Sequence, residues 1–244
     1  MIDTSATALE FSAAGPEIAF LPVGACEQHF GVLPLKTDNL QSERLTADIA
    51  ARFNSYVLPP VPFGTSLENT GAGGTVTLMP STLAAVVRDV VDSLYRQKFE
   101  IVVVVNSHGG NFILRPTIRE INYRTPGRKT IYVDPWEIVP ARKVAEIFEG
   151  KNELHCGEME ISVMLYMEPR TVRTEYIEDG DPAAERVELD MFSIPVLSEG
   201  KPWGLASRAT VEKGRRFYEL MIQYSVEFIE KIISRHKKHP SYHG

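Results

Sequence analysis

The sequence predicts an α/β fold, a three-layer α/β/α sandwich with a mostly parallel central sheet. Residues 18–23 and 101–105 are unbroken apolar runs, which are typical of parallel strands buried on both faces. Longer segments between such runs carry apolar residues three to five positions apart, as amphipathic helices do. Alternating strands and helices joined by right-handed crossovers build three layers. For 244 residues, 43% of them hydrophobic, we expect one domain over residues 1–244.

The other elements follow from local patterns and capping residues. Ser81 is a typical N-cap, and Asp134 followed by Pro135 opens a further helix. Residues 64–74 are rich in Gly, Thr, Ser and Asn and predict a mobile loop, whereas 172–202 predicts no regular structure beyond short strands. In chain order we expect strands at 18–23, 56–58, 75–78, 101–105 and 130–133, and helices at 39–53, 81–98, 112–123, 135–148, 161–167 and through 217–232.

Composition excludes several classes of protein. The formal charge of −6 argues against general nucleic-acid binding, and the one basic cluster, at 235–239, predicts a solvated, partly disordered tail. The run at 101–105 is too short to span a membrane, and residues 1–14 lack the pattern of a signal peptide, so we expect a cytoplasmic protein. Cys26 and Cys156 are expected to be small buried residues and not a disulfide or nucleophiles.

The stretch at 24–38 carries the first candidate site. Glu27 and His29 follow the buried strand at 18–23 and, two positions apart in extended backbone, point to the same side. Asp38 returns after a loop that contains Gly and Pro, so two carboxylates and an imidazole could converge on one cation. The alternative is that Glu27 and His29 form a hydrogen-bonded pair and Asp38 caps a helix.

Two later segments favour the metal interpretation. His108 follows the strand at 101–105, and Gly109 and Gly110 beside it let backbone approach a ligand closely. His155 precedes an apolar helix in which Glu158 and Glu160 would need a compensating charge. A bound cation would supply that charge.

Five motifs in order resemble those of the creatininase family, over nearly the whole chain. They are Gly-Ala-Cys-Glu-Gln-His at 24–29 with Thr-Asp at 37–38, Gly-Thr-Val-Thr-Leu at 74–78, Asn-Ser-His-Gly-Gly-Asn at 106–111, His-Cys-Gly-Glu-Met-Glu-Ile-Ser at 155–162, and Ala-Thr-Val-Glu-Lys-Gly at 209–214.

The resemblance implies an amidohydrolase with two divalent ions (Zn, Mn or Fe) that acts on small non-peptide amides, such as cyclic amides or formamides. It implies that Asp38 bridges the ions, with Glu27 and His108 on one and His29 and Glu160 on the other. A hydroxide shared by the ions would be the nucleophile. His155 and Glu158 would then transfer a proton and polarise the carbonyl.

The chain also departs from the family pattern. Characterised creatininases carry a metal-binding carboxylate at the position of Gly110, which Glu160 must replace here. Val32 stands where the family often has histidine, and a tryptophan upstream of the His155 motif is absent, which leaves Trp136 as the pocket aromatic. The fold is therefore better supported than creatinine as the substrate.

Rival activities within the resemblance are deformylation of a formamidopyrimidine nucleotide and trimming of a small peptide. A non-catalytic metal-binding family member is the rival from another class, although all five implied ligands are present. The resemblance further implies a homo-oligomer, commonly a hexamer, with a small amide as its partner and no nucleic acid or membrane.

Overall fold

The central sheet has five parallel strands in the order β1-β3-β2-β4-β5, which confirms the predicted α/β fold. The computed structural model describes residues 1–151 and 153–239. Phe20 on β2 lies opposite Val57 on β3 and Val103 on β4, which fixes the register at the centre of the sheet. The strands are β1 (Ile2–Asp3), β2 (Ile18–Val23), β3 (Ser55–Val57), β4 (Ile101–Asn106) and β5 (Lys129–Val133).

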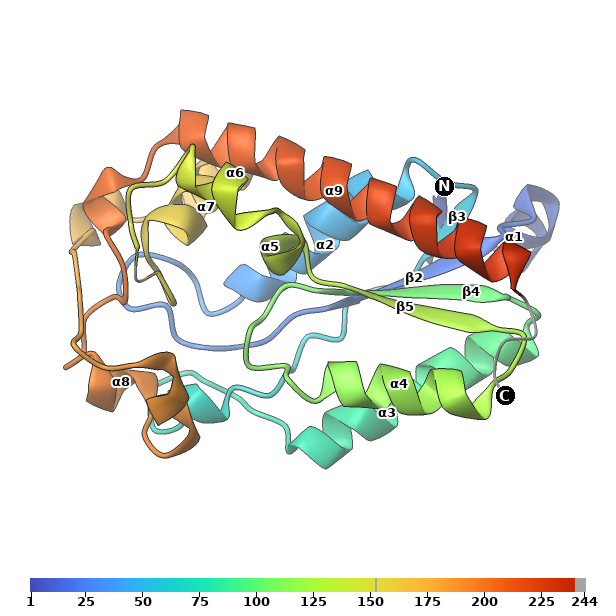
Figure 1. Cartoon of the computed structure of the whole chain (residues 1–244), viewed down its shortest axis with the longest axis horizontal. Helices are drawn as coiled ribbons and strands as arrows, with labels where there is room; N and C mark the ends of the chain where they lie inside the picture. Colours follow the sequence, from blue (N-terminus) through green and yellow to red (C-terminus); the bar gives the residue numbers. More distant parts are fainter. Residues whose placement is uncertain (152, 240–244) are drawn as a thin grey trace.

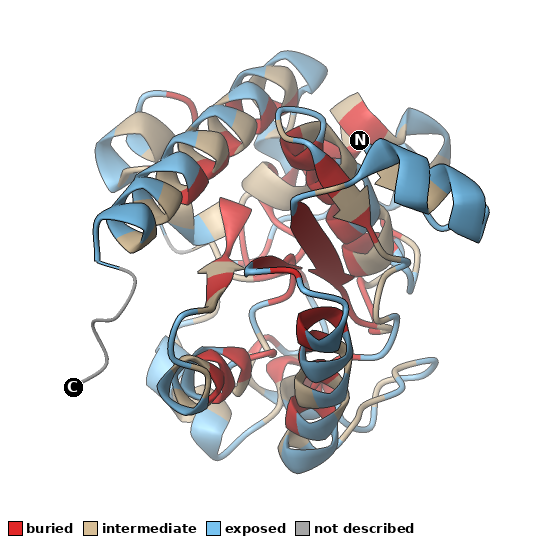
Figure 2. Cartoon of the chain, turned by 90° about the vertical axis from the view of Figure 1, so that its right-hand side faces the viewer, coloured by how far each residue is buried: buried red, intermediate tan, exposed pale blue. Residues whose placement is uncertain are grey.

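Helices cover both faces of the sheet, and alternate strand residues pack against each layer (Figure 1). Ala19 and Val102 face the cluster that includes α3 and α4, whereas Phe20 and Val103 face the cluster that includes α2 and α9. Continuous apolar runs are required because neither face of β2 or β4 meets water, as the buried strands in Figure 2 show. The long helices are α2 (Thr37–Ala50), α3 (Pro80–Arg96), α4 (Leu114–Arg124), α7 (Glu158–Met167) and α9 (Val211–Lys238).

Helix α9 packs closely on α7 near its own start. The Thr210 side chain caps α9 by accepting a hydrogen bond from the Lys213 N–H. A Cβ at Gly214 would collide with the backbone carbonyl of Ser162 on α7, so only glycine allows this approach. The packing holds α7 against α9.

Three predicted elements are wrong. The expected strand at 75–78 is absent, and only Val76 pairs there, with its N–H donating to the Cys26 carbonyl at 2.9 Å. The expected helix at 135–148 is two short helices, α5 (Pro135–Ile138) and α6 (Ala141–Ala145), because Pro140 forces Val139 into extended backbone. The basic cluster at 235–239, expected as a tail, lies in the last turn and C-cap of α9.

Short helical turns replace the irregular segments. Residues 172–202 contain helical turns where short strands were expected, and the Gly-rich loop contains a turn that was not predicted. The remaining short helices of the described chain are α1 (Ala8–Ala14), α8 (Ile194–Leu197), and the 3-10 helices η1 (Leu67–Asn69), η2 (Pro169–Thr171), η3 (Thr174–Tyr176), η4 (Arg186–Asp190) and η5 (Ala206–Arg208). Across the described part of the chain, no helix combines the length and apolar character needed to cross a bilayer.

Candidate metal centre

The acidic and imidazole side chains predicted from three separate segments meet at the carboxyl ends of β2 and β4. The residues after β2 supply Glu27 and His29, the loop after β4 supplies His108, and α7 with its preceding segment supplies Glu160 and His155. Asp38 joins them from the first turn of α2, with its carboxyl almost fully buried. It lies inside the helix and not at its N-cap, which is Lys36, so the capping alternative is wrong.

The first half of the cluster is centred on His108. Its Nδ1 atom lies 3.3 Å from Glu27 Oε1 and 3.7 Å from Asp38 Oδ2. Its Nε2 atom lies 2.9 Å from the Thr65 carbonyl oxygen, an acceptor that requires a proton on Nε2. Nδ1 is therefore the ring atom that faces the two carboxylates, and it can bind a cation once its proton is displaced.

The second half is centred on His29. Its Nε2 atom lies 3.3 Å from Glu160 Oε1 and 4.0 Å from Asp38 Oδ1. Its Nδ1 atom lies 3.1 Å from the Glu27 carbonyl oxygen, so this ring also carries its proton on the side away from the cluster. Asp38 thus presents one carboxylate oxygen to each half.

The donor set and its spacing fit divalent metal ions. Two donors on one ion with bonds of about 2.1 Å and a tetrahedral angle lie about 3.4 Å apart, and the distances of 3.3–4.0 Å around each histidine are close to this value. Asp38 Oδ2 is buried and has no hydrogen-bond partner among the described residues. A buried carboxylate oxygen without a partner is costly unless a cation binds it.

Glu27 and Glu160 are each held by a hydrogen bond to Oε2, the carboxylate oxygen farther from the histidines. The Asn69 amide donates to Glu27 Oε2 at 2.8 Å, and the Cys156 N–H donates to Glu160 Oε2 at 2.8 Å. In each case the other oxygen, Oε1, is the one near a histidine of the cluster. The carboxylates are therefore oriented before any ion binds.

The charges in the cluster shift its pKa values strongly. Burial raises the pKa of Asp38 to about 8, and the negative charge of Glu27 acts in the same direction. Burial lowers the pKa of His29, but the charges of Glu160 and Asp38 outweigh it and raise the value to about 10. Burial also raises the pKa of Glu27, but the charge of His108 and its hydrogen bond outweigh that effect and lower it well below its usual range. The metal-free cluster therefore holds protons that a cation would displace.

His155 lies beside the cluster, as expected. Its Nδ1 atom is 3.7 Å from Glu27 Oε1, and its ring centre is 4.6 Å from that of His29. Its Nε2 atom donates to the Gln28 carbonyl oxygen at 2.8 Å, which leaves Nδ1 as the atom that can accept and return a proton. Burial lowers the pKa of His155, and the positive charge of His29 adds to that shift.

Glu158 does not join the cluster, so the structure contradicts its predicted role in carbonyl polarisation. Its Oε2 atom accepts hydrogen bonds from the N–H groups of Glu149 and Gly150 at 2.8 and 2.9 Å. Its Oε1 atom forms an ion pair with Lys213 of α9. Both oxygens are therefore used to fix the 149–150 loop and α9 onto α7.

Of the three predicted substrate contacts, only Gly110 packs against the cluster. A Cβ at Gly110 would collide with the Glu68 carboxylate and with His108, whereas one at Gly109 would meet nothing within 4 Å. The Trp136 ring lies 5.7 Å from the Phe217 ring, in the hydrophobic cluster beneath α9. Substrate contacts of Trp136 and Gly109 stay predictions.

Glu160 lies against His29, and its replacement of a carboxylate at position 110 stays a prediction. The carboxylate next to Gly110 belongs to Glu68 on η1, whose Oε1 atom is 3.2 Å from His108 Nε2. Sequence reasoning missed Glu68 and Asn69. The available signal was that Glu68 is the one carboxylate in the Gly-rich segment at 64–74.

Two smaller expectations have mixed outcomes. Both cysteines are free, and Cys156 is buried as predicted, but Cys26 is only partly buried. Val32 is fully buried in a hydrophobic cluster with Leu33 and Ile161, so its apolar side chain packs in the interior.

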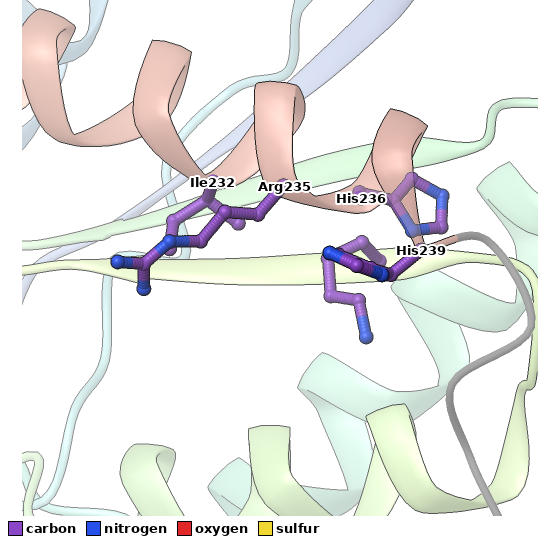
Figure 3. A pocket seen from close by; sticks show the side chains of 5 residues that line it. Ile232, Arg235, His236 and His239 are labelled. Atoms are coloured by element: carbon purple, nitrogen blue, oxygen red, sulfur yellow. The ribbon is translucent and has the colours of Figure 1, made fainter.

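A separate cavity of about 340 Å³ lies at the other end of the sheet, near the start of β5 (Figure 3). It is lined by Lys129, Ile232, Arg235, His236 and His239. Among residues 1–151 and 153–239, no carboxylate side chain lines this cavity, and none of the cluster residues contributes to it. We therefore place the chemistry at the carboxyl ends of the strands, where α/β sheets bind ligands.

The fold and this cluster define the class of a metal-binding α/β hydrolase, and comparison with known proteins identifies the family. The creatininase family model, described as creatinine amidohydrolase, matches residues 4–229. The chain belongs to the creatininase family, and it is a creatininase-like hydrolase.

Relatives and solved structures agree with this membership. The chain is 30% identical to a creatinine amidohydrolase of Pseudomonas putida, over 86% of this chain and 88% of the relative. It is 28% identical to a mycofactocin precursor peptide peptidase of Mycolicibacterium smegmatis, over 88% and 85% of the two chains. A solved structure named creatininase Mn matches with a TM-score of 0.78 and 25% identity, over 94% of this chain and 97% of that one.

Proposed function

We propose that the chain is a dinuclear amidohydrolase of a small non-peptide amide, either a cyclic amide or a formamide. The observation that carries the proposal is Asp38, which directs Oδ2 toward His108 and Oδ1 toward His29. A carboxylate placed in this way can bridge two ions. We assign Glu27 and His108 to one ion, and His29 and Glu160 to the other.

The ions, Zn²⁺, Mn²⁺ or Fe²⁺, would lower the pKa of water and polarise the amide carbonyl when bound. The protein residues then supply orientation and proton transfer. The outward bonds of Glu27, Glu160 and the two histidines hold the donors in place before substrate arrives. His155 Nδ1, which faces Glu27, can accept a proton from the attacking water and pass it to the leaving nitrogen.

A second candidate activity is trimming of a small peptide. The relatives named mycofactocin precursor peptide peptidase support it, because they match over 85–90% of their own length. Deformylation of a formamidopyrimidine nucleotide and metal binding without catalysis stay further alternatives. We also propose a cytoplasmic location and a closed homo-oligomer, a hexamer by resemblance. Light scattering would test the oligomeric state.

Metal analysis followed by a substrate panel tests the proposal. The purified protein should contain close to two divalent ions per chain by elemental analysis. The metal-loaded protein should hydrolyse at least one member of a panel of cyclic amides and formamides, and His155→Ala should slow that reaction while leaving metal content nearly intact. Cleavage of a short peptide but of no small amide would favour the second candidate. Tight metal binding with no turnover would favour the non-catalytic alternative.

A further inference from the structure

The 3-10 helix η1, in the Gly-rich loop between β3 and α3, contacts the outer atoms of two proposed metal ligands, Glu27 and His108. Asn69 donates its amide hydrogen to Glu27 Oε2, and its own Oδ1 atom accepts from Gln28 at 2.7 Å. Glu68, the preceding residue, places Oε1 at 3.2 Å from His108 Nε2. One three-residue turn therefore holds two of the ligands proposed for the same ion.

Gly110 makes room for this arrangement. A side chain at position 110 would overlap the Glu68 carboxylate, the Thr65 carbonyl and the His108 ring. The Thr65 hydroxyl also donates to the Gly110 carbonyl at 2.5 Å, which ties the loop after β4 to the segment that carries η1. The Glu68 carboxylate can therefore occupy this position only because residue 110 has no side chain.

We propose that Glu68 is a positioning residue of the metal centre and acts through His108. This inference rests on the proposed function. The Glu68 carboxylate lies beside the Nε2 hydrogen of His108, together with the Thr65 carbonyl and the Ser66 hydroxyl, and these contacts keep Nδ1 aimed at Glu27 and Asp38. A negative charge on the far side of the ring also makes the imidazole a stronger donor to a cation.

A different geometry would make Glu68 a direct ligand, because Glu27, Glu68 and His108 each offer an atom within 4.8 Å of the others. The His108 ring decides between the two roles. Its Nε2 atom carries the hydrogen donated to Thr65, so Glu68 approaches the protonated side of the ring. The positioning role is the one consistent with Nδ1 as the ligand atom.

Metal affinity of the Glu68→Gln and Glu68→Ala variants tests the inference without any substrate. Co²⁺ would be titrated into metal-free protein against a chelator, with folding checked by circular dichroism. Outer partners of metal-bound histidine typically contribute 10–100-fold in affinity. Glu68→Ala should therefore weaken one of the two sites by that factor. Glu68→Gln keeps an acceptor near Nε2 but loses the charge. Its Co²⁺ affinity should therefore lie between those of Glu68→Ala and the wild type.

Gly110→Ala gives an independent variant and Gly73→Ala its matched control. The first should displace the Glu68 carboxylate and weaken the same site, whereas the second adds a methyl group where nothing lies within 4 Å and should bind as the wild type does. The Co²⁺ absorption bands of Glu68→Gln should keep their positions, because no ligand is lost.

Three outcomes would overturn the inference or separate it from the proposed function. Unchanged affinity in both Glu68 variants, each folded, would remove the positioning role. A shift of the Co²⁺ bands to those of a lower coordination number would make Glu68 a ligand and also overturn it. Failure of the wild-type protein to bind Co²⁺ would instead refute the proposed function itself.

Discussion

Replacement of Asp38 by Asn is the most direct test of the proposed bridge. The two side chains have the same shape, but the amide nitrogen cannot bind a cation and the charge is lost. Because the two carboxylate oxygens face different histidines, one site loses its ligand atom and the other keeps only a neutral amide oxygen in place of a charged one. We expect the affinity to fall at each site by more than the 10–100-fold typical of outer-shell changes, which corresponds to more than about 2.7 kcal/mol.

The metal-free fold should tolerate this change, which separates metal loss from unfolding. Burial raises the pKa of Asp38 to about 8, so near pH 7 the metal-free protein already holds a neutral carboxyl at this position. A neutral Asn replaces it without adding a charge.

Elemental analysis and calorimetric titration would measure the ions, thermal unfolding would measure the fold, and Glu43→Gln, exposed on the same helix, is the control. Retention of one ion at wild-type affinity would refute the bridge, and retention of both would remove Asp38 from the site.

Three further predictions concern charge, one ligand and the substrate. In metal-free protein, the stability contributed by the raised pKa values of His29 (about 10) and Asp38 (about 8) is lost as pH rises through those values. The free energy of unfolding should therefore drop by on the order of 2 kcal/mol from pH 7 to 9 in urea titrations, and bound metal should suppress the drop. His108→Ala should empty one metal site and leave the other, as elemental analysis would show; loss of both ions would contradict the assignment. Creatinine should be hydrolysed more slowly than the best formamide or small amide, since the missing aromatic wall costs on the order of 1 kcal/mol. Creatine formation that exceeds every other turnover in the panel would refute this expectation.

The sequence was sufficient to predict the central strands of the sheet and most of the side chains that meet beside them, for physical reasons. Strands buried on both faces must be apolar throughout, so β2 and β4 stand out at 18–23 and 101–105. Polar residues directly after such strands must lie at the carboxyl edge of a parallel sheet, which brings Glu27 and His108 together. Local rules also have limits: Pro140 predicts a break that periodicity alone overlooked.

Contacts between distant segments could not be predicted from the pattern. Glu68 and Asn69 lie in a loop whose composition indicates turns and nothing more, and their role appears only when η1 packs against His108 and Glu27. The predicted contact of Trp136 with substrate rested on the absence of another tryptophan. The absence of one tryptophan shows that Trp136 is the aromatic residue left to choose, but it does not show where the Trp136 side chain lies.

The sequence left open which of Glu158 and Glu160 faces the metal site, because the two residues are only two positions apart. Residues two apart on a helix differ in direction by about 200°. At the start of α7 this sends Glu160 toward His29 and Glu158 toward the 149–150 loop and Lys213.

Glu158→Gln should therefore keep its metal but lose about 1.5–3 kcal/mol of stability, the range for hydrogen bonds to a buried charged group. Glu160→Gln should instead empty the site at His29, because Glu160 Oε1 is the carboxylate oxygen that faces this histidine. Elemental analysis beside urea unfolding would measure both quantities on each variant. Metal loss in Glu158→Gln with full retention in Glu160→Gln would show that α7 presents the opposite carboxylate to the ions. The hydrogen bonds to Glu149 and Gly150 argue against that outcome, because a metal-bound Glu158 would have to break them both.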